Sequence, residues 1–73
     1  MKVKKWVLDR VRQNAKLKRE LIYHLEISES KLYRLLRENR INGDLTIVKS
    51  VQIISAGLQI PASEILEDIK VGA

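Results

Sequence analysis

The chain has 73 residues and a net charge of +5, which allows one domain with a small hydrophobic core. It contains no cysteine, which excludes a disulfide framework and thiolate metal sites, and no apolar run approaches the ~20 residues of a transmembrane helix. The basic first residues reach Asp9 and Arg10 before the apolar segment of a secretory signal could form. We therefore expect a single cytoplasmic domain over residues 1–73, without a membrane partner.

The positive charge is concentrated in the first part of the chain. Residues 1–40 hold twelve Lys and Arg against five Asp and Glu, a net charge of +7, whereas residues 41–73 hold two against four, a net charge of −2. A basic surface attracts polyanions and speeds their capture. Nucleic acid, an acidic protein and anionic lipid are therefore candidate partners, and the alternative is that charged helix faces simply solvate a small protein.

Apolar residues recur at spacings of three and four through most of the chain, which indicates helices, and strand alternation is absent. The expected helices cover residues 3–13, 17–25, 29–38, 45–57 and 62–69. Trp6 falls on the apolar side of the first helix, so we expect it in the core. The fourth helix is expected to have one apolar side, which is shared by Ile47, Val48, Val51, Ile54 and Leu58. The fold class is therefore all-α, a compact bundle of about five short helices.

Capping and turn residues mark the ends of the expected helices. Ser28 is a good N-cap for the third helix. Residues 39–44 (NRINGD) have the composition of a loop. Asp44 is expected to cap the fourth helix, Gly57 to lie at its C-terminal stop, and Pro61 to begin the fifth helix.

Residues 17–36 are the most informative stretch, because they form two amphipathic helical patterns joined by a tight turn at Glu26-Ile27-Ser28. This stretch resembles the helix-turn-helix of phage repressors and Cro proteins, the XRE-like family. Leu21 and Ile22 stand at the family's Leu-Ala pair, and Leu32 stands at the apolar position after the family's Gly-Val-Ser turn. Aliphatic residues of the family's closing segment are matched by Val48, Val51, Ile54, Leu58, Ile60, Ile65 and Leu66.

The resemblance covers residues 4–66 and implies a lambda-repressor-like domain, with residues 29–38 as the recognition helix in the major groove. It implies a sequence-specific regulator of transcription, of phage or bacterial Cro/repressor type, that binds double-stranded DNA in the cytoplasm and is associated with the nucleoid. No cofactor and no small-molecule ligand is expected.

Three positions depart from the family pattern. Glu26 replaces the turn glycine, and a left-handed backbone there would cost about 1 kcal/mol for a residue with a Cβ. Ile22 replaces a small alanine and adds bulk where the two helices cross. Asn14 stands where the family has a glycine after its first helix, so it could take a left-handed backbone or the first two helices could run together.

Family placement also implies which residues contact DNA. Those expected at phosphates are Lys18, Arg37 and Arg40. Those expected at base edges are Glu29, Ser30 and Arg34. Arg34 is the main expected reader, because a guanidinium pairs bidentately with guanine O6 and N7. The full expected set is Lys18, Ser28, Glu29, Ser30, Lys31, Arg34, Arg37 and Arg40.

Each of these assignments has an alternative. Any one cation could be an ordinary solvated side chain. Glu29 could serve only the dipole of its own helix, and Ser28 only its N-cap. Lys31 could reach a base or the backbone, and Tyr33 could contact DNA or be a half-buried aromatic.

No catalytic or metal centre is expected from the sequence. The chain has one histidine, His24, which we expect to be exposed, and no cysteine, so no nucleophile–base pair or ligand set can be assembled. The acidic residues Glu64, Glu67 and Asp68 lack the partners and the pocket that acid–base catalysis needs. The chain is therefore not expected to be an enzyme.

An apolar patch is expected near the C-terminal end, from Ile53, Ile60, Ile69 and Val71, and an exposed patch on so small a protein suggests self-association. We expect a homodimer through residues 53–73, and the alternative is that the small core uses nearly all of these side chains. Two other functions stay open. One is a protein-interaction module, such as an antitoxin, an anti-repressor or an assembly adaptor, and the other is non-specific binding to the chromosome or to RNA.

Overall fold

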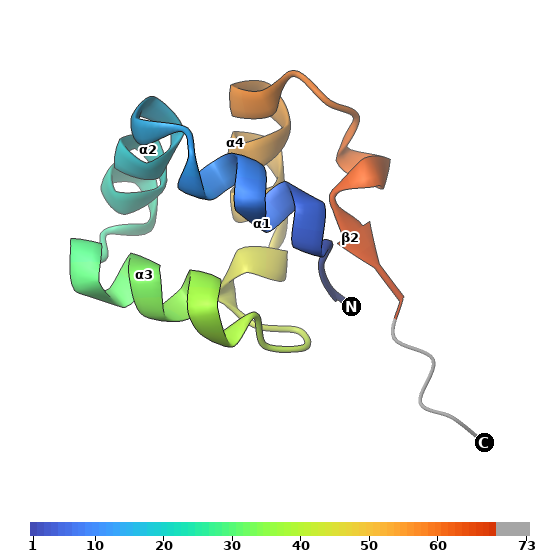
Figure 1. Cartoon of the computed structure of the whole chain (residues 1–73), viewed down its shortest axis with the longest axis horizontal. Helices are drawn as coiled ribbons and strands as arrows, with labels where there is room; N and C mark the ends of the chain where they lie inside the picture. Colours follow the sequence, from blue (N-terminus) through green and yellow to red (C-terminus); the bar gives the residue numbers. More distant parts are fainter. Residues whose placement is uncertain (69–73) are drawn as a thin grey trace.

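Four α-helices make up most of residues 1–68, the range that the computed structural model describes (Figure 1). They are α1 (Lys5–Arg12), α2 (Ala15–Leu25), α3 (Glu29–Glu38) and α4 (Val48–Leu58). The shorter elements are the 3-10 helices η1 (Asp44–Thr46) and η2 (Ala62–Glu64) and the strands β1 (Lys2–Val3) and β2 (Leu66–Glu67). None of the described helices is long and apolar enough to cross a membrane. The fold is compact and mostly helical, as expected, and residues 1–68 contain four α-helices rather than about five.

The strand pair was not expected from the sequence. β1 and β2 are antiparallel, with Val3 opposite Leu66, and the Lys4 amide donates to the Ile65 carbonyl at 2.9 Å. This pairing buries Val3 and Ile65 completely (both 0% exposed). The predicted helix over 62–69 is therefore wrong: η2 is a single turn, and the chain then extends into β2 to cover Val3. Residue 69 lies outside the described range.

Aliphatic side chains from all four α-helices fill the core, with η1, β1 and the residue before β2 closing it. The buried set is Val3, Val7, Leu8, Val11, Leu17, Leu21, Leu32, Leu36, Leu45, Val51, Ile54 and Ile65. Trp6 is not among them, since it is 42% exposed and its ring lies 5.8 Å from the Arg10 guanidinium. The predicted core position of Trp6 is wrong, because the inward side of α1 is formed by Val7, Leu8 and Val11, and Trp6 lies beside it, under the Arg10 side chain four residues on.

Gly57 lies inside α4, not at its end. A Cβ at Gly57 would stand 2.5 Å from Leu17 Cδ1, so the missing side chain lets α2 and α4 approach closely. The helix is ended instead by Gln59, whose φ of 56° is left-handed. The role predicted for Gly57 as the C-terminal stop is therefore wrong.

The start of α4 also differs from the prediction. Asp44 begins η1, and its carbonyl accepts a hydrogen bond from Ser50 Oγ at 2.8 Å. The residue that precedes α4 is Ile47, which has no capping side-chain bond. The buried side of α4 is formed by Ser50, Val51 and Ile54, and Val48 lies off this side. Ile47 and Val48 are therefore exposed (47% and 72%), and their predicted place on one apolar side with Val51 and Ile54 is wrong.

The segment from α2 to α3 is fixed by local capping bonds. Asn14 Oδ1 accepts from the Leu17 amide at 3.0 Å, with an extended backbone, so Asn14 caps α2 and separates it from α1. Glu26 ends α2 with a left-handed backbone (φ 55°), and Ser28 Oγ accepts from the Lys31 amide at 3.1 Å. The predicted Ser28 cap and the bounds of residues 29–38 are confirmed, whereas α2 begins two residues before the predicted Leu17.

Candidate nucleic-acid interface

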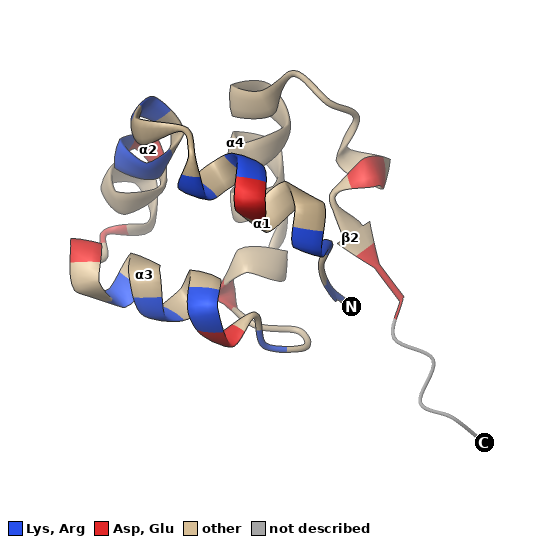
Figure 2. Cartoon of the chain, in the orientation of Figure 1, with Lys and Arg blue, Asp and Glu red and all other residues tan. Residues whose placement is uncertain are grey.

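α3 turns one side to the core and the other side outward. Leu32 and Leu36 are buried, whereas Ser30, Arg34 and Arg37 are exposed. These three residues are spaced at i, i+4 and i+7, so they lie on one face of the helix. In Figure 1, α3 runs along one edge of the molecule with the other helices on one side of it, and Figure 2 shows basic residues along its length. The outward face of α3 is therefore cationic and accessible.

One flank of this face is built with α2. The Tyr33 hydroxyl donates to Glu29 Oε1 at 3.1 Å, and Lys18 Nζ lies 5.4 Å from the centroid of the Tyr33 ring. Tyr33 itself is 47% exposed. This arrangement brings Lys18 of α2 beside α3, and it occupies one oxygen of Glu29 with a hydrogen bond.

A hollow of about 270 Å³ lies on this flank, between α2 and α3. Lys18 and Arg19 both line it, together with Ile22 and Glu29. Arg19 was not among the predicted residues. Its only signal in the sequence is its position beside Lys18, and the crossing of α2 over α3 is what brings it to the hollow.

The other flank is built with the chain that follows α3. Glu38 Oε1 lies 3.5 Å from Arg34 Nε, and Glu38 Oε2 accepts a hydrogen bond from Arg40 Nε at 2.7 Å. A cavity of about 430 Å³ adjoins this cluster, and Lys31 and Asp44 contribute to its lining. Sequence reasoning missed Glu38, although its i+4 spacing from Arg34 is a usable signal for an ion pair.

The remaining predicted residues differ in how they are held. Among residues 1–68, Lys31 and Arg37 form no ion pair with a carboxylate. Ser28 is exposed and acts as the N-cap of α3, which uses its oxygen as an acceptor and leaves its hydroxyl proton for another contact. The structure therefore brings the predicted set together around α3, from α2 on one side to the loop after α3 on the other.

α3 itself is held by neighbouring elements at its C-terminal end. Arg12 Nη2 donates to the Leu36 carbonyl at 3.0 Å, while its Nη1 pairs with Asp9 at 3.0 Å. Asn39, left-handed at φ 43°, ends the helix and donates through Nδ2 to the Val3 carbonyl at 3.0 Å. The Arg12 bond satisfies a carbonyl that the helix end leaves unpaired, and the two bonds connect α3 to α1 and to β1.

The exposed apolar side chains lie away from the segment predicted for self-association. Ile53 and Ile60 are partly buried against the core. The large exposed aliphatics of residues 41–68 are instead Ile41, Ile47 and Val48, at 56%, 47% and 72%. The predicted apolar patch is therefore wrong for residues 53–68, because the small core uses those side chains, and Ile69 and Val71 lie outside the described residues.

The described residues offer little for other chemistry. No three His, Asp or Glu side chains of residues 1–68 come together as a metal site requires. His24 is exposed, as expected, and packs edge-on against Tyr23 at a centroid distance of 5.2 Å. Comparisons with family models, curated proteins and solved structures found no match for this chain.

Proposed function

We propose that this chain binds double-stranded DNA in a sequence-dependent way and regulates transcription, with α3 in the major groove. The main support for this proposal is the cationic outward face of α3, where Ser30, Arg34 and Arg37 are exposed opposite a buried apolar side. α3 has 10 residues, which corresponds to a length of about 15 Å. The major groove of B-DNA is about 12 Å wide and accepts a helix.

The same proposal includes a helix-turn-helix of the XRE-like kind, formed by α2, the turn at Glu26 and α3. The short connection, the left-handed Glu26 and the Ser28 cap support it. In this arrangement the start of α2 lies near the DNA backbone, so Lys18 and Arg19 neutralise phosphates. Phosphate contacts give affinity and orientation, and they carry no sequence information.

The base contacts follow from the chemistry of the outward face. Arg34 recognises guanine through two parallel N–H donors, and Ser30 can donate a hydrogen bond to, or accept one from, several of the bases. Arg37 and Arg40 bind phosphates. Glu29 keeps one oxygen on the Tyr33 hydroxyl, and its second oxygen accepts from cytosine N4.

Selection from a random duplex library at near-physiological salt tests this function. An enriched motif is expected, with affinity that falls steeply as salt rises, by a log–log slope of about −0.9 for each phosphate neutralised. A homodimer would select two half-sites one DNA turn apart. If no motif is enriched although duplex DNA binds with a salt slope, the protein binds nucleic acid non-specifically and the proposal is wrong.

A second candidate function is a protein-interaction module, such as an antitoxin, an anti-repressor or an assembly adaptor. The exposure of the neighbouring aliphatic residues Ile47 and Val48 favours it, because contiguous exposed apolar surface marks protein-interaction sites. A stoichiometric protein partner that co-purifies without nucleic acid, and binding that changes little with salt, would favour this candidate over the first.

A further inference from the structure

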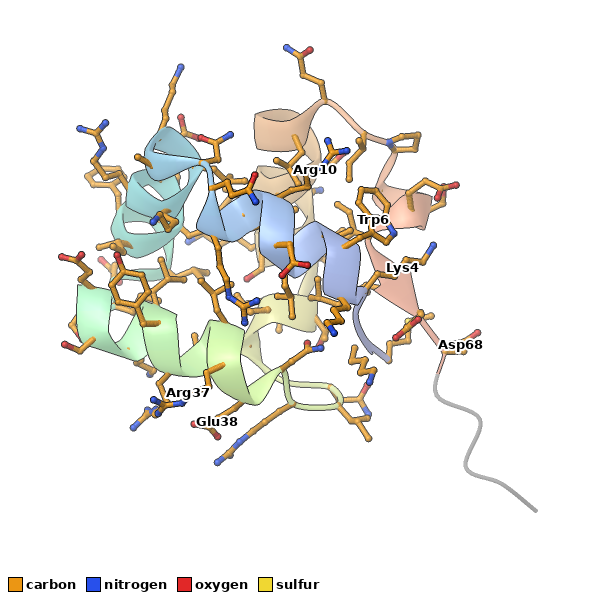
Figure 3. The ribbon with its side chains drawn as sticks, viewed as in Figure 1. Lys4, Trp6, Arg10, Arg37, Glu38 and Asp68 are labelled. Carbon is orange, nitrogen blue, oxygen red and sulfur yellow. The ribbon has the colours of Figure 1, made fainter. Side chains whose placement is uncertain are left out.

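One carboxylate holds two arginines at the C-terminal end of the α3 face. Glu38 places one oxygen against Arg34 Nε (3.5 Å) and the other against Arg40 Nε (2.7 Å). The side chain of Glu38 is 29% exposed, whereas those of Arg34 and Arg40 are 56% and 73% exposed. Figure 3 shows Glu38 beside Arg37, on the side of α3 that faces away from the other helices. The carboxylate is thus the better shielded centre of an Arg–Glu–Arg cluster.

The fold explains how the three side chains meet. Arg34 and Glu38 are four residues apart on α3, which places them on one side of the helix. Arg40 joins them because the chain reverses at Asn39, whose φ of 43° is left-handed. Asn39 is held in this position by its hydrogen bond to the Val3 carbonyl at 3.0 Å. The cluster is therefore set by a fixed helix end rather than by a loose loop.

The contacts within the cluster leave the Nη groups of both arginines available for a ligand. A guanidinium carries five N–H donors in a planar fork, of which Nε supplies one. Both contacts to Glu38 use Nε, and among the described residues the Nη groups of Arg34 and Arg40 form no hydrogen bond. Bidentate pairing to guanine or to a phosphate needs two parallel N–H groups, which the two Nη atoms can provide.

The cavity of about 430 Å³ beside the cluster gives a ligand group room to reach these forks. Its charged lining consists of Lys31, Arg34, Arg40, Glu38 and Asp44, three cations and two carboxylates. The net charge of this lining is only +1, so the attraction for DNA here depends more on where the cations are held than on how many there are.

We propose that Glu38 is a positioning residue of the DNA interface: it fixes Arg34 and Arg40 through Nε and thereby sets the base preference. This inference rests on the proposed function. A carboxylate on a DNA-binding face lowers the attraction for every phosphate, whereas positioning of Arg34 strengthens only the contact with the preferred base. The net effect of Glu38 is therefore expected to be opposite on preferred and on scrambled duplexes. Glu38 weakens non-specific binding and strengthens the discrimination between sequences.

The test compares Glu38→Gln with Glu64→Gln. Both variants remove one negative charge from an ion pair, and Glu64 pairs with Lys4 at 3.6 Å from η2, which is outside the α3 face. Dissociation constants are measured for the selected duplex and for a scrambled one. We expect Glu38→Gln to tighten scrambled binding by about two- to fivefold and to lower the specificity ratio by about tenfold, part of the discrimination of one bidentate contact. Glu64→Gln should leave the ratio unchanged.

Two further measurements separate positioning from charge. In an Arg34→Lys background, which has no guanidinium fork, Glu38→Gln should no longer change the specificity ratio. In the free protein, the NMR signal of the Arg40 Nε–H should exchange slowly with water, and Glu38→Gln should move it to the position of a solvated arginine. Glu38→Asp, which keeps the charge on a shorter side chain, should give an intermediate ratio.

The outcomes distinguish the two proposals. If the wild-type protein prefers one sequence but Glu38→Gln keeps the same ratio as Glu64→Gln, the positioning role is wrong and the proposed function stands. If the wild-type protein binds both duplexes equally, the proposed function is wrong and this role falls with it.

Discussion

The two sides of α3 are built from different kinds of contact. The inner side is fixed by the buried Leu32 and Leu36 and by the bond from Arg12 to the Leu36 carbonyl. The outer side carries the exposed residues Arg34 and Arg37. Arg34 has one exposed ion pair, which contributes little to stability, and Arg37 has none among residues 1–68. The placement of α3 and the chemistry that it presents can therefore be changed separately. Substitutions inside should cost stability, and substitutions outside should change binding alone.

The largest effect is expected on the inner side. Leu32→Ala removes a side chain that is 0% exposed, and the lost burial plus the cavity should reduce the free energy of unfolding by about 2–5 kcal/mol. Urea denaturation measures this loss. Ser30→Ala, on the outer side of the same helix, is the control and should stay within about 0.5 kcal/mol of the wild-type protein. Equal losses for the two variants would contradict the division of α3 into two sides.

On the outer side, Arg34→Ala should relax base preference at one position by about 1–3 kcal/mol of discrimination, the value of one bidentate contact. Its urea midpoint should match that of the wild-type protein, because the Arg34 side chain is exposed. Binding to a panel of single-base variants of the selected duplex measures the discrimination. A motif that survives Arg34→Ala unchanged would remove Arg34 from the set of base-reading residues.

A smaller effect is expected at the turn that enters α3. Glu26 has a left-handed backbone (φ 55°), so Glu26→Gly should relieve strain and raise the free energy of unfolding by about 1 kcal/mol. The midpoint of thermal unfolding should rise by about 4–8 °C. Glu26→Gln removes the same charge but keeps the Cβ, and it should give no such gain. A gain of the same size in both variants would assign the effect to charge.

The smallest effect is expected for Lys18, at the flank shared by α2 and α3. Lys18→Ala should weaken binding to the selected and scrambled duplexes by the same factor and reduce the salt slope by about 0.9, because the proposed function gives Lys18 one phosphate contact. Lys49→Ala removes an exposed cation from α4 and serves as the control, with no change in slope expected. Affinities measured over a range of salt concentrations give both slopes.

The sequence was sufficient to predict helix bounds where a capping side chain fixes the start of the helix. Ser28 caps α3, so residues 29–38 were correctly predicted, and Leu32, which the resemblance placed at an apolar position, is buried. The N-terminal and C-terminal segments were predicted wrongly because their structure depends on each other. Val3 and Leu66 pair across the whole described chain, and no local pattern records such a contact.

The candidate site was predictable to a similar degree. The resemblance implied DNA contacts for Ser30, Arg34 and Arg37, and the structure has all three exposed on one face of α3. The part played by Glu38 was not predicted, since it depends on the left-handed Asn39 that returns Arg40 to the helix end. Arg19 was missed because the crossing of α2 and α3 decides which cations of α2 reach the face.

The pairing of β1 with β2 also has a consequence for the order in which the domain folds. It joins Lys2 to Glu67, and closing a chain segment of that length costs roughly 4 kcal/mol of entropy, whereas each helix forms from near neighbours. The helices can therefore assemble before the two ends meet. During synthesis Val3 cannot be covered until Ile65 has left the ribosome. The core residue that is translated last therefore completes the packing around the one that is translated first.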